Sequence, residues 1–164
     1  MMAPHFPLDV ITTNGKHPEI DNTPPDVLIE NGSLLSWKLE QARAIWSKKL
    51  GRECHVRITY GYRCPQLNTA CGSTSTTSAH LEFSAADCIP EGMTLREAWD
   101  ALREDPEFMK GVDQLIIERG CIHIGLPVKA HGFVARHELR LDTTVNGVRS
   151  YPLWAIWPAK GVCH

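Results

Sequence analysis

The sequence has no long apolar run, no basic tract and no recognisable secretory leader. No stretch approaches the roughly 20 consecutive apolar residues that a membrane-spanning helix needs, so no membrane span is expected. The 17 Lys and Arg residues are scattered along the chain and are outnumbered by 19 Asp and Glu residues, which argues against a nucleic-acid partner. The N-terminal stretch MMAPHFPLDVITTNGKHPE lacks a charged segment followed by a continuous apolar one, so no signal peptide is predicted.

Six cysteines are present, but none form a C-x-x-C pair of the kind that structural zinc sites use. Without a secretory signal, we expect most of them to be reduced and to act as small buried hydrophobic residues. Cys64 and Cys71 flank a turn-rich segment and are the pair that a disulfide could link.

The chain length of 164 residues fits one domain that is large enough to bury a core. Residues 1–32 are rich in Pro, Asn and Asp and show no periodicity, which predicts an extended N-terminal arm. Residues 33–164 are predicted to form a single domain. The order of helices and strands within it is typical of an α+β fold with a small antiparallel sheet flanked by helices.

The elements expected within this domain follow from helical spacing, strand alternation and turn residues. They are a helix from Ser33 to Leu50, a strand over 54–62, a loop over 63–77 with a helical turn at 66–70, a strand over 84–90, a helix over 94–105 that begins with a Thr94–Glu97 capping box, and two hairpins with turns at Arg119-Gly120 and Asn146-Gly147.

The first hairpin places two polar side chains on one face of an apolar ribbon. A two-residue turn at Arg119-Gly120 pairs Glu118 with Cys121 and Ile116 with His123. Because side chains alternate along a strand, Glu118 and His123 then share a face and are diagonal neighbours. A carboxylate and an imidazole in apolar surroundings require partners, since burying an unpaired charge is costly.

His80 and Asp87, seven positions apart in STTSAHLEFSAADC, offer two ligands of the kind that zinc accepts. His123 could supply a third. Three protein ligands and one open position are typical of catalytic zinc, and Glu118 would remain as a general base beside a water in the open position. Spacing alone leaves open that each of these residues is structural.

The block GYRCPQLNTACGSTSTTSAHLEFSAAD resembles the zinc-dependent M15 peptidases, which include D-alanyl-D-alanine carboxypeptidases and phage endolysins. Their pattern is roughly S-G-Y-R, then L-N, then S-x-H-x-x-G-x-A-x-D. The later segment DQLIIERGCIHIG is similar to the closing element of the phage branch, in which D-Q-L-I precedes the acid and W-x-H-I ends the hairpin. The residues that match are Gly61, Tyr62, Arg63, Leu67, Asn68, Ser78, His80, Ala85 and Asp87.

The resemblance implies a fold like that of the hedgehog and DD-peptidase domains, with a zinc ion held by His80, Asp87 and His123. Glu118 would be the acid-base residue. Arg63, Tyr62 and Ser78 would bind the substrate, and Arg63 would bind a carboxylate or polarise the scissile carbonyl. The expected reaction is hydrolysis of an amide bond in a peptidoglycan stem peptide, by a protein made in the cytoplasm that reaches the cell wall after release or as part of a virion. Other phage virion or lysis proteins are further candidate partners.

Three positions depart from the family pattern. Phe83 stands where a glycine usually follows the first ligand, Tyr60 stands where Ser often precedes Gly-Tyr-Arg, and Cys121 replaces the aromatic residue two positions before the last ligand. A bulky Phe83 in a tight loop would move His80 or narrow the cleft. Phe83 and the Trp-bearing tail YPLWAIWPAKG leave open a non-catalytic wall-binding or virion structural module on the same scaffold. A peptidase that acts on another small peptide is a further alternative.

Overall fold

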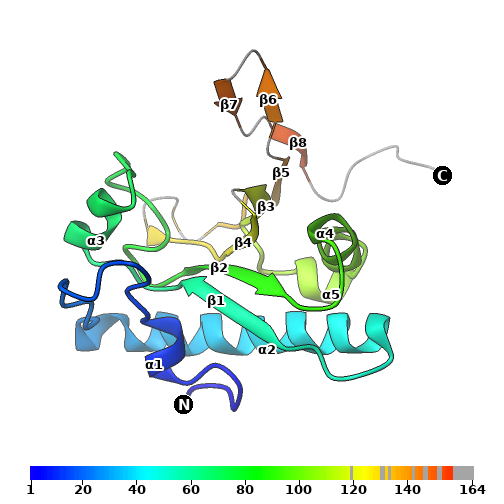
Figure 1. Cartoon of the computed structure of the whole chain (residues 1–164), viewed down its shortest axis with the longest axis horizontal. Coiled ribbons are helices and arrows are strands. Elements are labelled where there is room, and N and C mark those ends of the chain that lie inside the picture. Colours follow the sequence, from blue (N-terminus) through cyan, green and yellow to red (C-terminus); the bar gives the residue numbers. More distant parts are fainter. Residues whose placement is uncertain are drawn as a thin grey trace.

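The structure, a computed structural model, describes residues 1–118, 120–129, 132, 134–141, 143–145, 148–150 and 153–156. The elements, labelled in Figure 1, are α1 (Leu8–Ile11), the 3-10 helix η1 (Asp26–Leu28), α2 (Ile29–Leu50), β1 (Val56–Tyr60), α3 (Pro65–Ala70), β2 (Ala85–Pro90), α4 (Leu95–Arg103), α5 (Pro106–Met109), β3 (Gln114–Glu118), β4 (Cys121–Gly125), β5 (Glu138–Leu141), β6 (Thr143–Val145), β7 (Val148–Ser150) and β8 (Leu153–Ile156). None of the helices in these ranges is long and apolar enough to cross a bilayer.

A six-stranded sheet in the order β1-β2-β4-β3-β5-β8 forms the centre of the fold, and β6 pairs with β7 in a separate hairpin. The predicted α+β class is confirmed. One pairing differs from the antiparallel sheet that was expected, because β5 runs parallel to β3. The chain leaves β4 and returns on the far side of β3, where Asp113 accepts hydrogen bonds from the backbone and the guanidinium of Arg136 and so secures the crossover.

The helices cover one face of the sheet and leave the other for polar side chains. Figure 1 shows α2 running along β1 and β2, with α4 and α5 at one end of the sheet. Strand alternation points Ile122 and Ile124 toward these helices, and both are fully buried. The main core also includes Leu35, Leu39, Ala42 and Trp46 from α2, Ala98, Trp99 and Leu102 from α4, and Ala86, Cys88 and Leu115 from the sheet.

Both predicted hairpins form in the expected register. Glu118 pairs with Cys121 and Ile116 with His123, and Arg119 of the turn lies outside the described residues. Val145 pairs with Val148 across the second hairpin, whose predicted tip, Asn146-Gly147, also lies outside them. The predicted capping box at the start of α4 is confirmed as well, since Thr94 and Glu97 each accept a hydrogen bond from the backbone of the other.

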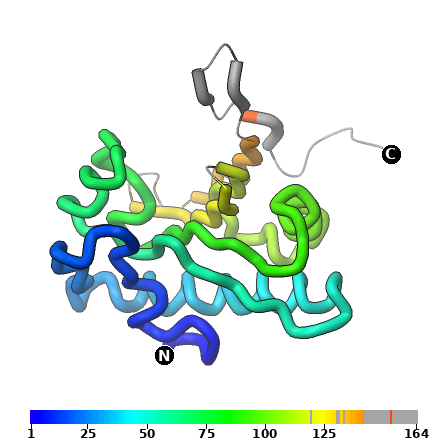
Figure 2. Tube along the Cα trace, viewed as in Figure 1, coloured from blue at the N-terminus to red at the C-terminus, as the bar shows by residue number. Residues whose placement is uncertain are grey.

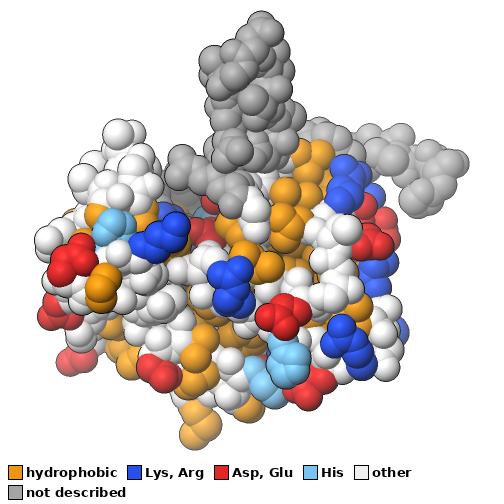
Figure 3. All heavy atoms as spheres, viewed as in Figure 1, with side chains coloured by type: hydrophobic (Ala, Val, Ile, Leu, Met, Phe, Trp, Pro, Cys, Tyr) orange, Lys and Arg blue, Asp and Glu red, His pale blue; other side chains and the backbone are white. Residues whose placement is uncertain are grey.

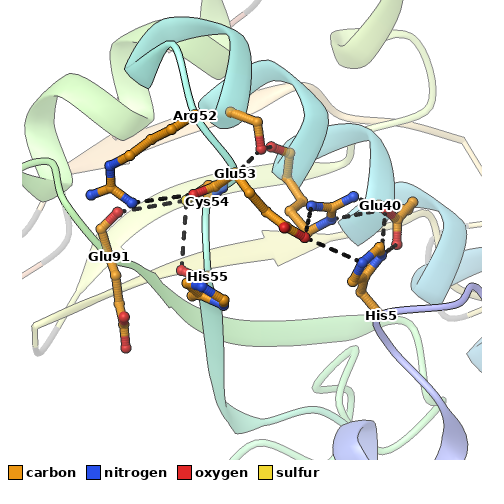
Figure 4. Close-up of polar contacts among 9 residues, drawn as sticks. His5, Glu40, Arg52, Glu53, Cys54, His55 and Glu91 are labelled. Atoms are coloured by element: carbon orange, nitrogen blue, oxygen red, sulfur yellow. Dashed lines mark hydrogen bonds and ion pairs between the residues drawn. The ribbon is translucent and has the colours of Figure 1, made fainter.

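The first long helix begins four residues earlier than predicted, at Ile29 instead of Ser33. Ser33 therefore lies within the helix, and its hydroxyl donates to the carbonyl of Met1 at 2.8 Å. His5 adds a second contact between the N-terminal segment and α2, because its Nδ1 lies 3.0 Å from Oε1 of Glu40 (Figure 4). These contacts hold the start of the chain against the helix.

The five described cysteines are all free, which agrees with the prediction that most are reduced. Cys64 and Cys71 are among them, so no disulfide links the two ends of α3. The sixth cysteine, Cys163, lies outside the described residues. Charge is dispersed as the sequence suggested, and Figure 3 shows Lys and Arg side chains interspersed with Asp and Glu on the face in view.

Phe83 adopts a left-handed backbone conformation, with φ of 53°, at the position where glycine was expected. Its ring is fully buried and lies 5.4 Å from the ring of Tyr62, measured between centroids. Gly32 of α2 makes room for it: a Cβ on Gly32 would lie 2.5 Å from Phe83 Cε1. The ring therefore points into the core, and the expected narrowing of the cleft does not occur.

Replacing Gly32 with alanine is expected to destabilise the protein, although alanine in a helix interior normally gains about 1 kcal/mol over glycine. The new methyl group would overlap the Phe83 ring, and such overpacking costs about 1–3 kcal/mol. Chemical denaturation of Gly32→Ala in the native chain and in a Phe83→Leu background measures the coupling. The penalty should shrink or reverse with leucine; an equal penalty in both backgrounds would contradict this account of the packing.

Candidate metal centre

His80, Asp87 and His123 converge on the sheet face opposite the helices. His80 follows the loop after α3, Asp87 lies in β2 and His123 in β4, and the antiparallel register sets Asp87 directly opposite His123. His123 Nδ1 lies 2.9 Å from Asp87 Oδ1 and 3.3 Å from His80 Nε2. His80 Nε2 is also 3.3 Å from Asp87 Oδ1. Three atoms with lone pairs therefore form a nearly equilateral triangle.

The triangle fits a small divalent cation. Tetrahedral zinc with bonds of about 2.0–2.1 Å to nitrogen and oxygen spaces its ligand atoms about 3.3 Å apart. The three observed separations, from 2.9 to 3.3 Å, need little adjustment to reach that value. The donor set of two imidazole nitrogens and one carboxylate oxygen is also one that zinc accepts. The group could therefore hold a metal ion.

The backbone orients His80 for this role. Its Nδ1 lies 2.7 Å from the carbonyl oxygen of Gly61, an acceptor that requires the proton to be on Nδ1. Nε2 of the neutral ring is then left with a free lone pair that points at Asp87 and His123. Fixing the tautomer through the second ring nitrogen is how proteins commonly prepare a histidine ligand.

The site is buried, and each ionisable group shifts the pKa values of its neighbours. Burial lowers the pKa of His80, and this effect outweighs the carboxylate of Asp87. Burial also opposes ionisation of Asp87, but the two histidines hold the pKa of its carboxyl well below its usual range. For His123, the hydrogen bond and charge of Asp87, with the charge of Glu118, overcome burial and raise the pKa. Asp87 is therefore an anion and His80 a neutral donor.

Glu118 and Arg63 both lie next to the triangle. Glu118 Oε1 is 3.8 Å from His123 Nδ1, and Arg63 Nη2 is 4.0 Å from Asp87 Oδ2. The Arg63 side chain is 13% exposed, and its Nε makes no hydrogen bond within the described chain. Both residues line a cleft of about 770 Å³ that also reaches Asp87. A substrate in this cleft could contact Asp87, the acid and the guanidinium together.

Two of the predicted substrate-binding residues take other positions. Tyr62 is 4% exposed, and its ring packs against Phe83 beneath the site. Ser78 lies in the turn before His80, where its carbonyl accepts a hydrogen bond from the backbone of Leu81. Neither is among the described residues that line the cleft. The predicted group thus divides into five residues at the site and two in the scaffold that supports it.

Asn22 supports the site, and no sequence motif points to it. Its buried amide donates to the carbonyls of Thr12 and Tyr62, at 2.9 Å each, and accepts from the backbone N–H of Cys64 at 2.8 Å. These bonds bracket Arg63 on both sides. Figure 2 shows the N-terminal segment beside the chain that leaves β1. No local pattern marks such a residue, because Tyr62 and Cys64 lie 40 and 42 positions away.

Replacing Asn22 with alanine is expected to lower the free energy of unfolding by about 2–3 kcal/mol, because it leaves two carbonyls and one N–H without partners. Asn14→Ala is the matched control, since the Asn14 amide makes a single bond, to the carbonyl of Ile20. Urea denaturation and zinc titration of both variants measure the effect. Asn22→Ala should also weaken zinc binding, and equal losses in the two variants would refute the positioning role.

The comparisons with known proteins assign the chain to a family. The family model described as Peptidase M15 matches residues 10–125, a span that contains His80, Asp87, Glu118 and His123. The comparison with curated proteins found no match. M15 peptidases are metallopeptidases, and the family model covers well over half of the chain. The protein therefore belongs to the peptidase M15 family.

Proposed function

We propose that the protein is a zinc peptidase that hydrolyses an amide bond in peptidoglycan stem peptides. The observation that carries this proposal is the triangle of His80 Nε2, Asp87 Oδ1 and His123 Nδ1, together with the open cleft that Asp87 lines. Three protein ligands with a free direction toward solvent are typical of a catalytic metal, whereas structural zinc sites close the fourth position with protein. Membership of a peptidase family supports the same assignment.

His80, Asp87 and His123 would hold the zinc ion. When bound, zinc supplies Lewis acidity, which lowers the pKa of a coordinated water to about 7 and polarises a carbonyl group. The carbonyl of Gly61 keeps His80 in the tautomer that donates from Nε2. Asp87 contributes the negative charge that partly neutralises the cation in this buried position.

Glu118 is proposed to act as the general base and then as the general acid. Its carboxylate lies just outside the ligand triangle, 3.8 Å from His123 Nδ1, and its side chain is 24% exposed to the cleft. From there it can accept a proton from the attacking water and return that proton to the leaving amine. A carboxylate at this distance is close enough to contact the water without being a ligand itself.

Arg63 is proposed to bind the oxygen of the scissile carbonyl or a carboxylate of the substrate. A guanidinium group carries a positive charge and offers a planar pair of donors. Its backbone is fixed on both sides, since the Arg63 N–H donates to the carbonyl of His80 and Asn22 holds Tyr62 and Cys64. The side chain therefore approaches the cleft from a rigid loop, as an oxyanion-stabilising group must.

The assignment of peptidoglycan as substrate rests on the resemblance of DQLIIERGCIHIG to the phage branch of the family. A phage lysis or virion enzyme would reach the wall after release, with other lysis or virion proteins as partners. The division into an arm over 1–32 and a catalytic domain over 33–164 also remains a proposal. The alternative of a non-catalytic wall-binding module was motivated by Phe83, whose ring packs against Gly32 and leaves the cleft open.

Glu118→Gln and His80→Ala should separate proton transfer from metal binding. Purified native protein is expected to bind one equivalent of zinc and to reduce the turbidity of cell-wall suspensions. Glu118→Gln should retain the metal but lose at least a hundredfold in rate, since it cannot exchange protons. His80→Ala should lose both zinc and activity.

Glu91→Gln is the matched control for the charge change, because Glu91 is exposed and lies outside the residues that line the cleft. Metal analysis and mass spectrometry of the digested muropeptides give the readouts. Zinc binding without hydrolysis by the native protein would favour the wall-binding alternative, and products from another peptide alone would favour a different substrate.

A further inference from the structure

Beyond the metal ligands, the cleft has a second row of side chains on the same sheet face. Arg57 of β1 pairs with Ile89 of β2, and Glu118 of β3 pairs with Cys121 of β4. Continuing the register of β2 and β4 by one residue sets Ile89 beside Cys121. The row therefore runs from Arg57 across an apolar floor to Glu118, and all four residues line the cleft.

Lys16 adds a second cation to the cleft on its β1 side, in the loop that packs against Tyr60. The loop over 13–16 packs against β1, and a Cβ on Gly15 would lie 2.7 Å from the hydroxyl oxygen of Tyr60. That hydroxyl also interacts with the backbone of Lys16. The loop thus forms the wall of the cleft beside the edge strand, and Thr13, Gly15 and Lys16 all line it.

Arg57 and Lys16 differ from most other basic residues near the sheet in that their charges are not compensated. Arg136 and Arg140 are paired with acids, and Arg63 approaches Asp87. Arg57 and Lys16 are exposed, and neither side chain makes an ion pair or hydrogen bond within the part of the chain that the structure describes. A bound divalent ion would neutralise the negative charges of Asp87 and Glu118. The basic side chains that line the cleft would then make its electrostatic potential positive.

We infer that Arg57 and Lys16 form an anion-binding subsite that holds a free carboxylate of the substrate away from the scissile bond. The inference rests on the proposed function, since it assigns substrate specificity to the same cleft. An extended substrate lying over Ile89 would reach the subsite from the metal ligands, and the planar guanidinium of Arg57 suits bidentate contact with a carboxylate.

The spacing defines which carboxylate the subsite can reach. Ile89 lies two residues beyond Asp87 on β2, which is about 7 Å along the strand, and Arg57 lies one strand further, about 4.8 Å across. An extended peptide advances about 3.3 Å per residue. The carboxylate is therefore roughly two or three residues from the bond that is cut. In a stem peptide, a γ-linked glutamyl residue or a diamino acid could supply it.

Cys121 is consistent with this use of the cleft floor. The phage-branch pattern has an aromatic residue at this position, which here is a small side chain whose Sγ lies 3.0 Å from the Glu118 carbonyl oxygen. An aromatic ring would cover the floor between Glu118 and Ile89. The smaller cysteine leaves the path from the acid to Arg57 open.

Synthetic stem peptides test the subsite with the full-length zinc-loaded protein. Three forms are compared: both carboxylates free, the glutamyl carboxylate amidated, and the diamino-acid carboxylate amidated. Arg57→Gln and Lys16→Gln should each lower kcat/KM roughly three- to tenfold on the form with both carboxylates free, mainly through KM, and this loss should shrink in high salt.

On the form in which the recognised carboxylate is amidated, the variants should match the native protein, which identifies the source of the anion. Arg57→Lys should recover part of the loss. Lys49→Gln, at an exposed position of α2 outside the cleft, is the charge-matched control and should change nothing. Losses that are equal for free and amidated peptides would overturn the subsite while leaving the peptidase proposal intact.

Calorimetric binding of the same peptides separates this inference from the proposed function. If the protein hydrolyses none of them yet binds the free acid more tightly than its amide, and Arg57→Gln abolishes that preference, the subsite stands and the peptidase proposal falls. If binding shows no preference for a carboxylate, the subsite falls whatever the activity.

Discussion

The register between β2 and β4 is the constraint on which the site depends. It sets Asp87 opposite His123, and a slip of one residue would put the two side chains on opposite faces and turn one of them into the apolar core. Their neighbours Ala86, Cys88, Ile122 and Ile124 fill that core, so the hydrophobic pattern resists such a slip. The alternation that folds the sheet is thus also what presents the candidate metal ligands on its opposite face.

A buried cluster of an anion and two imidazoles is costly to assemble, because each group loses water. The protein offsets this cost with fixed polar partners: the Gly61 carbonyl for His80, the histidines for Asp87, and Arg63 nearby. A bound cation would add the largest compensating charge. The cluster is therefore hard to explain as an incidental feature of packing and is readily explained as a metal centre.

Phe83 illustrates how a departure from a family pattern can be absorbed at a distance. The position keeps the left-handed backbone that glycine would favour, so the loop that carries His80 retains its path. The ring is accommodated by Gly32, more than 50 residues earlier in the chain, where the absence of a side chain on α2 leaves the space it fills. Phe83 would obstruct the cleft only if its side chain pointed outward.

The sequence by itself determined the α+β class and the hairpin register that puts Glu118 beside His123, because strand alternation and turn chemistry act over a few residues. The residues expected at the metal centre followed from the resemblance of their motifs to the M15 family. Tertiary structure alone decided the parallel placement of β5, the core position of Tyr62 and Phe83, and the role of Asn22. It also placed Arg57 on the row that ends at Glu118. These features depend on contacts between segments tens of residues apart, and no local periodicity records which distant segments will meet.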